Sequence, residues 1–264
     1  MTITDERPAT GRPTRGTDPR LRARQLEIAR AQGRRRLKIL LGVLSAGVLA
    51  GGVLALLHSP LLSARHIAIA GARETTRREI LAVSGLAADP PLIDVNGAAD
   101  AAAIERLPWV ASATVSRAWP TGVRVVIAER VPTAEIALGA GRYAISDASG
   151  RVLEVRTGAW PGLVSVHGIA AIPPAGHELG ATARAGVEVA GAVPVSLVER
   201  IDGIVVRGGA PITLVLDHGP TVILGNADEL REKMVALATV LARVPLARVV
   251  TIDLRVPADP VLTS

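Results

Sequence analysis

The longest apolar stretch of the chain covers residues 39–57 and carries no charged side chain. A helix rises about 1.5 Å per residue, so this stretch covers roughly 28 Å, close to the roughly 30 Å of hydrocarbon in a bilayer. The stretch is apolar on all sides, whereas a helix on the core of a soluble domain keeps one polar face. The pattern therefore predicts a single transmembrane helix at residues 38–58.

Basic residues gather on one side of this helix. Residues 1–38 carry eleven Arg or Lys against four Asp or Glu, and the rest of the chain carries nineteen against twenty. Cytoplasmic flanks of membrane helices are enriched in Arg and Lys, so we predict a single-pass type II protein with a cytoplasmic N-terminus. Residues 1–37 are predicted to be a disordered basic tail, with a short juxtamembrane helix inside it at residues 21–36.

A cleaved export signal is the alternative to a permanent anchor. Arg34, Arg35 and Arg36 approximate a twin-arginine motif. The apolar stretch is longer than the roughly 7 to 15 residues of a signal core, and residues 58–66 offer no clear small-x-small cleavage site. These observations favour the anchor.

The next part of the chain, residues 63–131, alternates between strand and helix patterns. A capping box is formed by Thr76 and Glu79, and Pro108 ends the second apolar helical stripe. We expect, in order, a strand at residues 64–70, a helix after Thr76, a helix at residues 98–107, and strands at residues 112–119 and 123–130. A three-stranded sheet with two helices on one face is the economical way to bury these stripes.

Short strands dominate residues 132–256, which predicts a mainly antiparallel β domain with flanking helices. One helix is expected at residues 181–192 and a stronger one from Asn226, with Glu229 in capping position. The last predicted strand covers residues 248–256, and residues 257–264 are expected to be a flexible tail. The whole chain is therefore predicted to be α+β: a transmembrane helix followed by two extracytoplasmic domains.

The sequence carries few groups typical of catalysis or ligand binding. It has no Cys, and its five His lie at positions 58, 66, 167, 177 and 218 without a metal-binding spacing. Residues 139–144 fit a variant dinucleotide fingerprint but lead into a turn instead of the required helix. With four aromatic residues, stacking on nucleic-acid bases is disfavoured. We predict no catalytic residue, metal, cofactor, small-molecule substrate or nucleic-acid partner.

Two tryptophans of residues 63–131, Trp109 and Trp119, are expected to pack in its small core. Arg117 is expected to be exposed on the middle strand, and Glu129 is expected on an edge strand. Both are candidates for partner contact.

Short motifs in both extracytoplasmic units resemble the FtsQ/DivIB family of bacterial cell-division proteins. The first unit resembles the family's POTRA domain, and the second resembles its β domain. The matching motifs are IAIAG at 67–71, LPWV at 107–110, AWP at 118–120, ERVP at 129–132, AISDASGRVLE at 144–154, LVLDHG at 214–219, ILGN at 223–226, Lys233, and IDLR at 252–255.

The resemblance implies a non-catalytic divisome scaffold in the inner membrane at the division septum. Such a protein recruits and links FtsB-like and FtsL-like partners, with septal peptidoglycan synthase components as further partners, and helps regulate septal peptidoglycan synthesis. A membrane-anchored or exported enzyme of unknown reaction is the alternative. A deep pocket with converging titratable groups would favour that alternative.

In the family, the last strand of the β domain lies at a sheet edge and adds a strand of the FtsB partner. Main-chain hydrogen bonds then supply affinity and alternate side chains supply selectivity. Alternation places Val250, Ile252, Leu254 and Val256 on one face. The alternative is a central strand with both edges filled. The predicted partner-binding residues are Thr251, Ile252, Asp253, Leu254, Arg255 and Val256, with Val115, Arg117 and Glu129 near a second surface on the POTRA domain.

Overall fold

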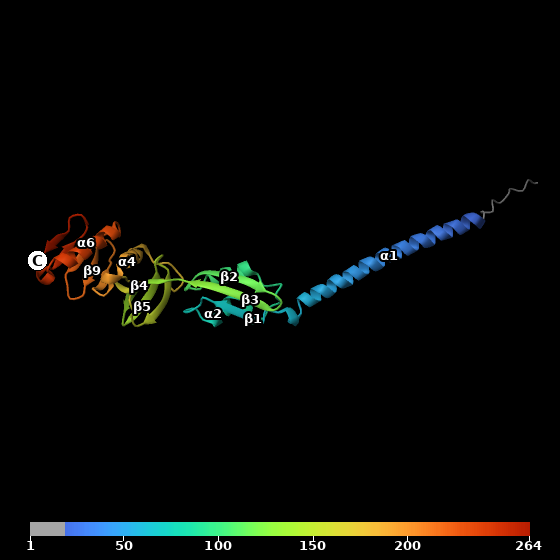
Figure 1. The fold of residues 1–264 in the computed structure, drawn as a ribbon, viewed down its shortest axis with the longest axis horizontal. Coiled ribbons are helices and arrows are strands. Elements are labelled where there is room, and N and C mark those ends of the chain that lie inside the picture. Colours follow the sequence, from blue (N-terminus) through green and yellow to red (C-terminus); the bar gives the residue numbers. More distant parts are fainter. Residues whose placement is uncertain (1–18) are drawn as a thin grey trace, which may run out of the picture. The chain divides into compact units, whose positions relative to one another are not determined.

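The computed structural model describes the backbone of residues 19–264, and side chains from Arg36 onward except those of Leu37 and Ala247. The chain divides at Ser59 into two units, each of which is described by itself. Residues 1–18 of the predicted tail lie outside the described residues. Figure 1 traces the described elements in sequence order.

The N-terminal unit contains one long helix, α1 (Pro19–Leu57). Its segment Lys38–Leu57 is long and apolar enough to cross a membrane, as the hydrophobic pattern predicts. Residues 19–37 continue the same helix, in agreement with the juxtamembrane helix predicted at residues 21–36 and in contrast to a disordered tail up to residue 37. Most residues of this part of the chain are Arg, Leu, Ala, Gln or Glu, which favour helix.

The second unit begins with a POTRA-type β-α-α-β-β arrangement. The sheet order is β1-β3-β2, with β1 parallel to β3 and β2 antiparallel to it. This confirms the predicted order of elements. The elements are η1 (Pro60–Leu62), β1 (His66–Ala70), α2 (Arg77–Ser84), η2 (Leu86–Ala88), α3 (Gly97–Ile104), β2 (Val110–Ala118) and β3 (Gly122–Glu129).

Local sequence signals explain these boundaries. The Thr76 hydroxyl accepts the N–H of Glu79, and the Glu79 carboxylate accepts the N–H of Thr76, so the predicted capping box starts α2. The α2 residue Ile80 and the α3 residue Ile104 are fully buried against Val125 of β3. Both helices therefore cover one core.

One exposed tryptophan contradicts the expected packing of this domain. The side chain of Trp119 is 55% exposed at the end of β2, so the prediction that it fills the core is wrong. Aliphatic residues of both helices already fill that core. Trp109 is buried as expected, but it packs with Ile145 and Leu153 of the following domain.

The remaining elements form the β domain around a nine-stranded sheet. Its order is β12-β11-β10-β9-β8-β7-β4-β5-β6. The elements are β4 (Pro132–Gly139), β5 (Arg142–Asp147), β6 (Val152–Thr157), β7 (Val164–His167), α4 (Ala181–Ala192), α5 (Val195–Val198), β8 (Ile201–Val205), β9 (Ile212–Leu216), β10 (Thr221–Gly225), α6 (Leu230–Arg243), η3 (Leu246–Arg248), β11 (Thr251–Asp253) and β12 (Val261–Thr263).

The β domain is mainly antiparallel, as predicted, but it is not a simple meander. Strand β7 is parallel to both β4 and β8, and β11 is parallel to β10. Parallel neighbours need a crossover connection. The β5–β6 hairpin, helices α4 and α5, and helix α6 provide the three connections.

Helices α4 and α6 bury apolar side chains in the core of this sheet. Val187 of α4 and Leu237 of α6 are fully buried together with Leu214 of β9. Helix α6 begins later than predicted, at Leu230. Glu229 makes no side-chain cap at this helix end, because its backbone lies in the left-handed region with φ 51°.

Candidate partner-binding surface

Strand β11 supplies the residues that the sequence predicts for partner binding. It is shorter than the predicted strand of residues 248–256, because η3 occupies Leu246–Arg248 and regular pairing stops at Asp253. It lies between β10 and β12. The expectation of an edge strand is therefore wrong for this structure, and the alternative of a strand with both sides filled describes it.

The segment that fills the second side of β11 was expected to be a flexible tail. Residues Val261–Thr263 form β12, antiparallel to β11, with Leu262 opposite Ile252. The Val250 N–H also donates to the carbonyl oxygen of Thr263 at 2.8 Å. Strand β12 is thus the edge strand at this end of the sheet.

Alternation along the predicted strand holds only at its centre. Ile252 and Leu254 are fully buried in the domain core, whereas Val250 and Val256 are 64% and 61% exposed. Strand β12 thus covers the main chain of Ile252, whereas the side chains of Val250 and Val256 are open to solvent.

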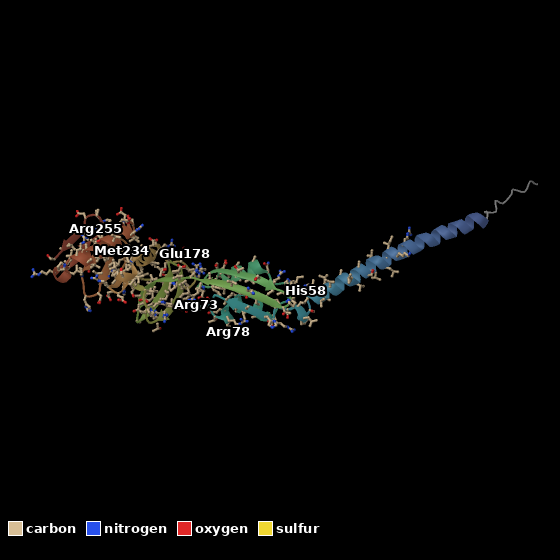
Figure 2. All side chains as sticks on the ribbon, viewed as in Figure 1. His58, Arg73, Arg78, Glu178, Met234 and Arg255 are labelled. Atoms are coloured by element: carbon tan, nitrogen blue, oxygen red, sulfur yellow. The ribbon has the colours of Figure 1, made fainter. Side chains whose placement is uncertain are left out.

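An ion pair joins the last residue of β11 to the chain that follows it. The guanidinium of Arg255 contacts the carboxylate of Asp253, with Nη2 at 2.6 Å from Oδ2. The side-chain hydrogen bond from Arg255 and its backbone N–H hold the pKa of Asp253 below the ordinary value. Arg255 is labelled in Figure 2. Its exposed side chain leaves room for contact with a partner.

A buried lysine supports the loop beside this surface. The Nζ of Lys233 donates to the carbonyl oxygen and to Oδ1 of Asn226, at 3.2 and 3.1 Å, and lies 3.6 Å from the Asp228 carboxylate. A Cβ at the neighbouring Gly225 would lie 3.0 Å from the Arg255 side chain. Asn226, expected to cap a helix, instead receives this lysine.

The strands that carry Arg117 and Glu129 in the POTRA domain occupy other positions in the sheet than predicted. The sheet order makes β2 the edge strand and β3 the central strand, so the expected positions of Arg117 and Glu129 are reversed. Val115 is 8% exposed, and its side chain packs in the core. The Arg117 guanidinium donates to the carbonyl oxygen of Val95 at 2.9 and 2.7 Å.

Glu129 binds a turn of its own domain. Its carboxylate accepts the backbone N–H groups of Arg73, Glu74 and Thr75, with the shortest distance, 2.8 Å, to Thr75. Partial burial raises the pKa of Glu129, but these N–H groups outweigh it and hold the pKa below its ordinary value. This carboxylate is thus a structural acceptor.

The POTRA and β domains are joined by a compact set of contacts. Arg130 Nη1 lies 2.7 Å from Asp147 Oδ2, and Arg130 Nε donates to the Val110 carbonyl oxygen. The rings of Trp109 and Trp160 lie 5.7 Å apart. Burial raises the pKa of Asp147, but hydrogen bonds from Ser149, Arg130 and the Arg151 backbone lower it overall.

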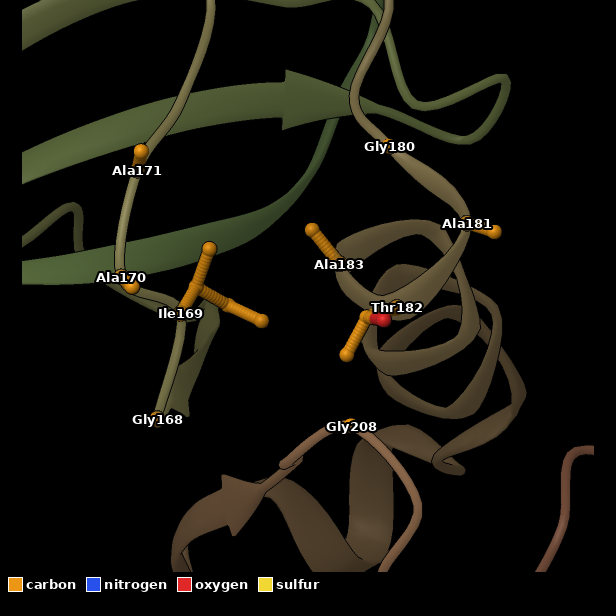
Figure 3. A pocket seen from close by; sticks show the side chains of 9 residues that line it. All are labelled: Gly168, Ile169, Ala170, Ala171, Gly180, Ala181, Thr182, Ala183 and Gly208. Carbon is orange, nitrogen blue, oxygen red and sulfur yellow. The ribbon is translucent and has the colours of Figure 1, made fainter.

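A cavity beside α4 is lined by short, uncharged side chains. It measures 320 Å³ and is lined mainly by Gly and Ala, with Ile169 and Thr182 as its larger members. Figure 3 shows these short side chains around an open space. No titratable side chain lines it, so this cavity offers nothing for acid-base catalysis.

Side chains that could hold a metal ion do not cluster in the described residues. Within the part of the chain that the structure describes, no three His, Cys, Asp or Glu side chains come together as a metal site.

Comparison with known proteins agrees with this architecture. The model of the FtsQ-type POTRA domain matches residues 62–130, and the model of the Cell division protein FtsQ/DivIB C-terminal domain matches residues 134–255. A POTRA domain followed by this β domain defines a class of bacterial cell-division proteins.

Individual relatives point the same way. The chain is 30% identical to Cell division protein FtsQ of Corynebacterium glutamicum over 185 residues, which are 70% of this chain and 81% of that protein. It is 30% identical to Cell division protein FtsQ of Mycolicibacterium smegmatis over 210 residues, which are 79% of this chain and 61% of that longer protein. The chain belongs to the FtsQ/DivIB family, which supports a role in cell division.

Proposed function

We propose that this protein is a non-catalytic scaffold of the division machinery. It crosses the inner membrane once through α1, with a cytoplasmic N-terminus, and acts at the division septum. There it links FtsB-like and FtsL-like proteins, contacts septal peptidoglycan synthase components, and helps to regulate septal peptidoglycan synthesis.

The observation that carries this proposal is the sheet end around β11. Strand β12 is the edge strand at this end of the sheet, and exposed apolar side chains lie beside it. Such an edge suits an extended partner segment, because main-chain pairing and side-chain contact act together. Val250 and Val256 supply such side chains on either side of Thr251–Asp253. Asp253 and Arg255 add polar contacts at the same place.

The POTRA domain supplies a second, side-chain surface in this proposal. Arg117 and Glu129 lie on β2 and β3, and both already serve intramolecular contacts. Val115 has a buried side chain, and a Cβ at Gly97 would lie 2.4 Å from its carbonyl oxygen, so little of this residue is open to a partner. Partner contact at these three residues stays a prediction.

Capture of an FtsB-like partner tests the scaffold. The 264-residue chain in detergent would be mixed with the extracytoplasmic segment of the FtsB-like protein from the same organism. We expect saturable binding, which Val250→Asp or Val256→Asp weakens by about tenfold or more, because a charge at the centre of an apolar contact costs about 1.4 kcal/mol or more.

Val195→Asp is the matched control. Val195 is 90% exposed on α5, so its replacement leaves both folding and capture unchanged. Equal binding by all three variants, or absence of binding by the unmodified chain, would contradict the proposed surface.

A further inference from the structure

Trp119 differs from the other two tryptophans of the chain in its exposure. Its side chain is 55% exposed, whereas Trp109 and Trp160 pack with apolar residues of the β domain. It lies between β2 and β3, directly before Pro120. The indole of Trp119 therefore contributes little to the POTRA core and is available for contact with a surface outside the domain.

The turn that carries Trp119 lies at the end of the POTRA sheet where the chain enters the domain. Strand β1 is parallel to β3, with His66 opposite Gly122. The His66 N–H donates to the carbonyl oxygen of Thr121 at 3.1 Å. The first residue of β1 and the turn between β2 and β3 are therefore neighbours.

A short connection joins this entry end of the domain to the proposed membrane helix. The carbonyl oxygen of Leu62 accepts the N–H of Leu92 at 2.8 Å, so Leu62 is already part of the POTRA structure. It is the fifth residue after Leu57, where α1 ends. Five residues span at most about 18 Å, even when fully extended. The chain itself therefore keeps the entry end of the POTRA domain close to the outer surface of the membrane.

A second apolar side chain lies on this connection. Leu61 of η1 is 69% exposed. The charges around it are mixed, because an exposed Arg65 follows it and Asp89 and Asp94 lie on the neighbouring loop. Attraction of this end to a surface is therefore expected from its apolar side chains and not from net charge.

We propose that Trp119, together with Leu61, contacts the lipid headgroup region on the outer face of the membrane. The indole of Trp suits this depth of a bilayer, because its ring lies among apolar groups while its N–H meets water. The exposed Leu61 adds apolar area to the same contact. This inference rests on the membrane anchor in the proposed function and is independent of partner binding.

Native tryptophan fluorescence tests the contact. The 264-residue chain is reconstituted into nanodiscs of phosphatidylcholine with bromine on the acyl chains near the headgroup, which quenches tryptophans that touch the lipid. All three tryptophans follow α1 in the sequence, so quenching reports on the extracytoplasmic domains alone. We expect quenching in the unmodified chain and its loss in Trp119→Ala.

Two measurements accompany this comparison. The urea unfolding curve of Trp119→Ala is expected to match that of the unmodified chain, because the side chain lies outside the buried core of the POTRA domain. Leu61→Ser keeps the indole but removes apolar area, and a partial loss of quenching is expected. Unchanged quenching in Leu61→Ser would exclude Leu61 from the contact.

A matched control moves the exposed indole to the other domain. Val195→Trp is combined with Trp119→Ala, because Val195 is 90% exposed on α5, far along the chain from α1. This chain has the same number of tryptophans as the unmodified one. It is expected to show no more quenching than Trp119→Ala alone.

Three results would overturn the contact. Absence of quenching in the reconstituted unmodified chain, or equal quenching with and without Trp119, would do so while leaving the anchor and the scaffold intact. Quenching of the indole at position 195 would mean that the lipid reaches any exposed tryptophan. Failure of the chain to enter nanodiscs would count against the membrane anchor itself, and with it against this inference.

Discussion

The outer sides of two strands, β2 of the POTRA domain and β11 of the β domain, are covered in different ways. On β2 of the POTRA domain, the Ala113 N–H donates to the Glu105 carboxylate at 3.0 Å, and a Cβ at Gly97 would lie 2.4 Å from the Val115 carbonyl oxygen. On β11 of the β domain, the cover is another strand. A carboxylate and a close-packed helix end block strand addition, whereas a strand preserves the geometry that a new strand needs.

The largest loss of stability is expected from a change at Leu254, whose buried side chain holds the segment after β11 in the core. Leu254→Ala removes a fully buried side chain and should lower the free energy of unfolding by about 2–5 kcal/mol. Urea unfolding followed by circular dichroism measures this. A loss below about 1 kcal/mol would mean that β11 is not a firm template, which would weaken the contrast with β12.

An intermediate effect is expected on the POTRA side. Glu129→Gln removes the charged acceptor of three backbone N–H groups and should cost about 1–3 kcal/mol at pH 7. The same urea titration measures the loss.

The pH dependence of this difference follows from the lowered pKa of Glu129. Its contribution is fully present above the ordinary carboxyl pKa of about 4.3. It is lost as pH falls through the lower pKa of the folded state, so the wild type and Glu129→Gln should converge toward pH 3. A constant difference from pH 7 to pH 3 would contradict the role of the charge.

The smallest effects are expected at the two covers themselves. Glu105→Ala and Leu262→Ala each remove an exposed side-chain contact and should change the free energy of unfolding by less than about 1 kcal/mol. Their local effects should differ. Amide exchange should accelerate at Ala113 in the first variant and across Val261–Thr263 in the second, and the reverse pattern would break the comparison.

The sequence predicts the regular elements of the POTRA domain because their signals are local. The capping pair Thr76 and Glu79 starts a helix whatever the tertiary context, and apolar periodicity identifies β2 and β3. The order of strands across the sheet is not local. Arg117 and Glu129 were therefore assigned to the wrong kind of strand although both strands were found.

At the candidate partner-binding surface, the strand at residues 251–253 was predicted from the sequence, but the strand β12 beside it was not. Residues 261–263 follow Pro260 and have no periodicity of their own, so their strand depends on the edge that β11 offers. The place of strand β7 in the sheet likewise depends on distant neighbours, since it has only four residues and lies between β4 and β8. Lys233 was noted by resemblance, but its burial beneath Asn226 required the three-dimensional structure.

The parallel pairing of β10 with β11 also sets an order of assembly. The two strands become neighbours only after α6 has crossed the sheet between them, and contacts between such distant segments form late because closing the intervening loop costs entropy. The proposed partner-binding edge therefore requires that helix α6 has already packed on the sheet. On the proposed function, partners are expected to bind there only after the β domain has folded completely.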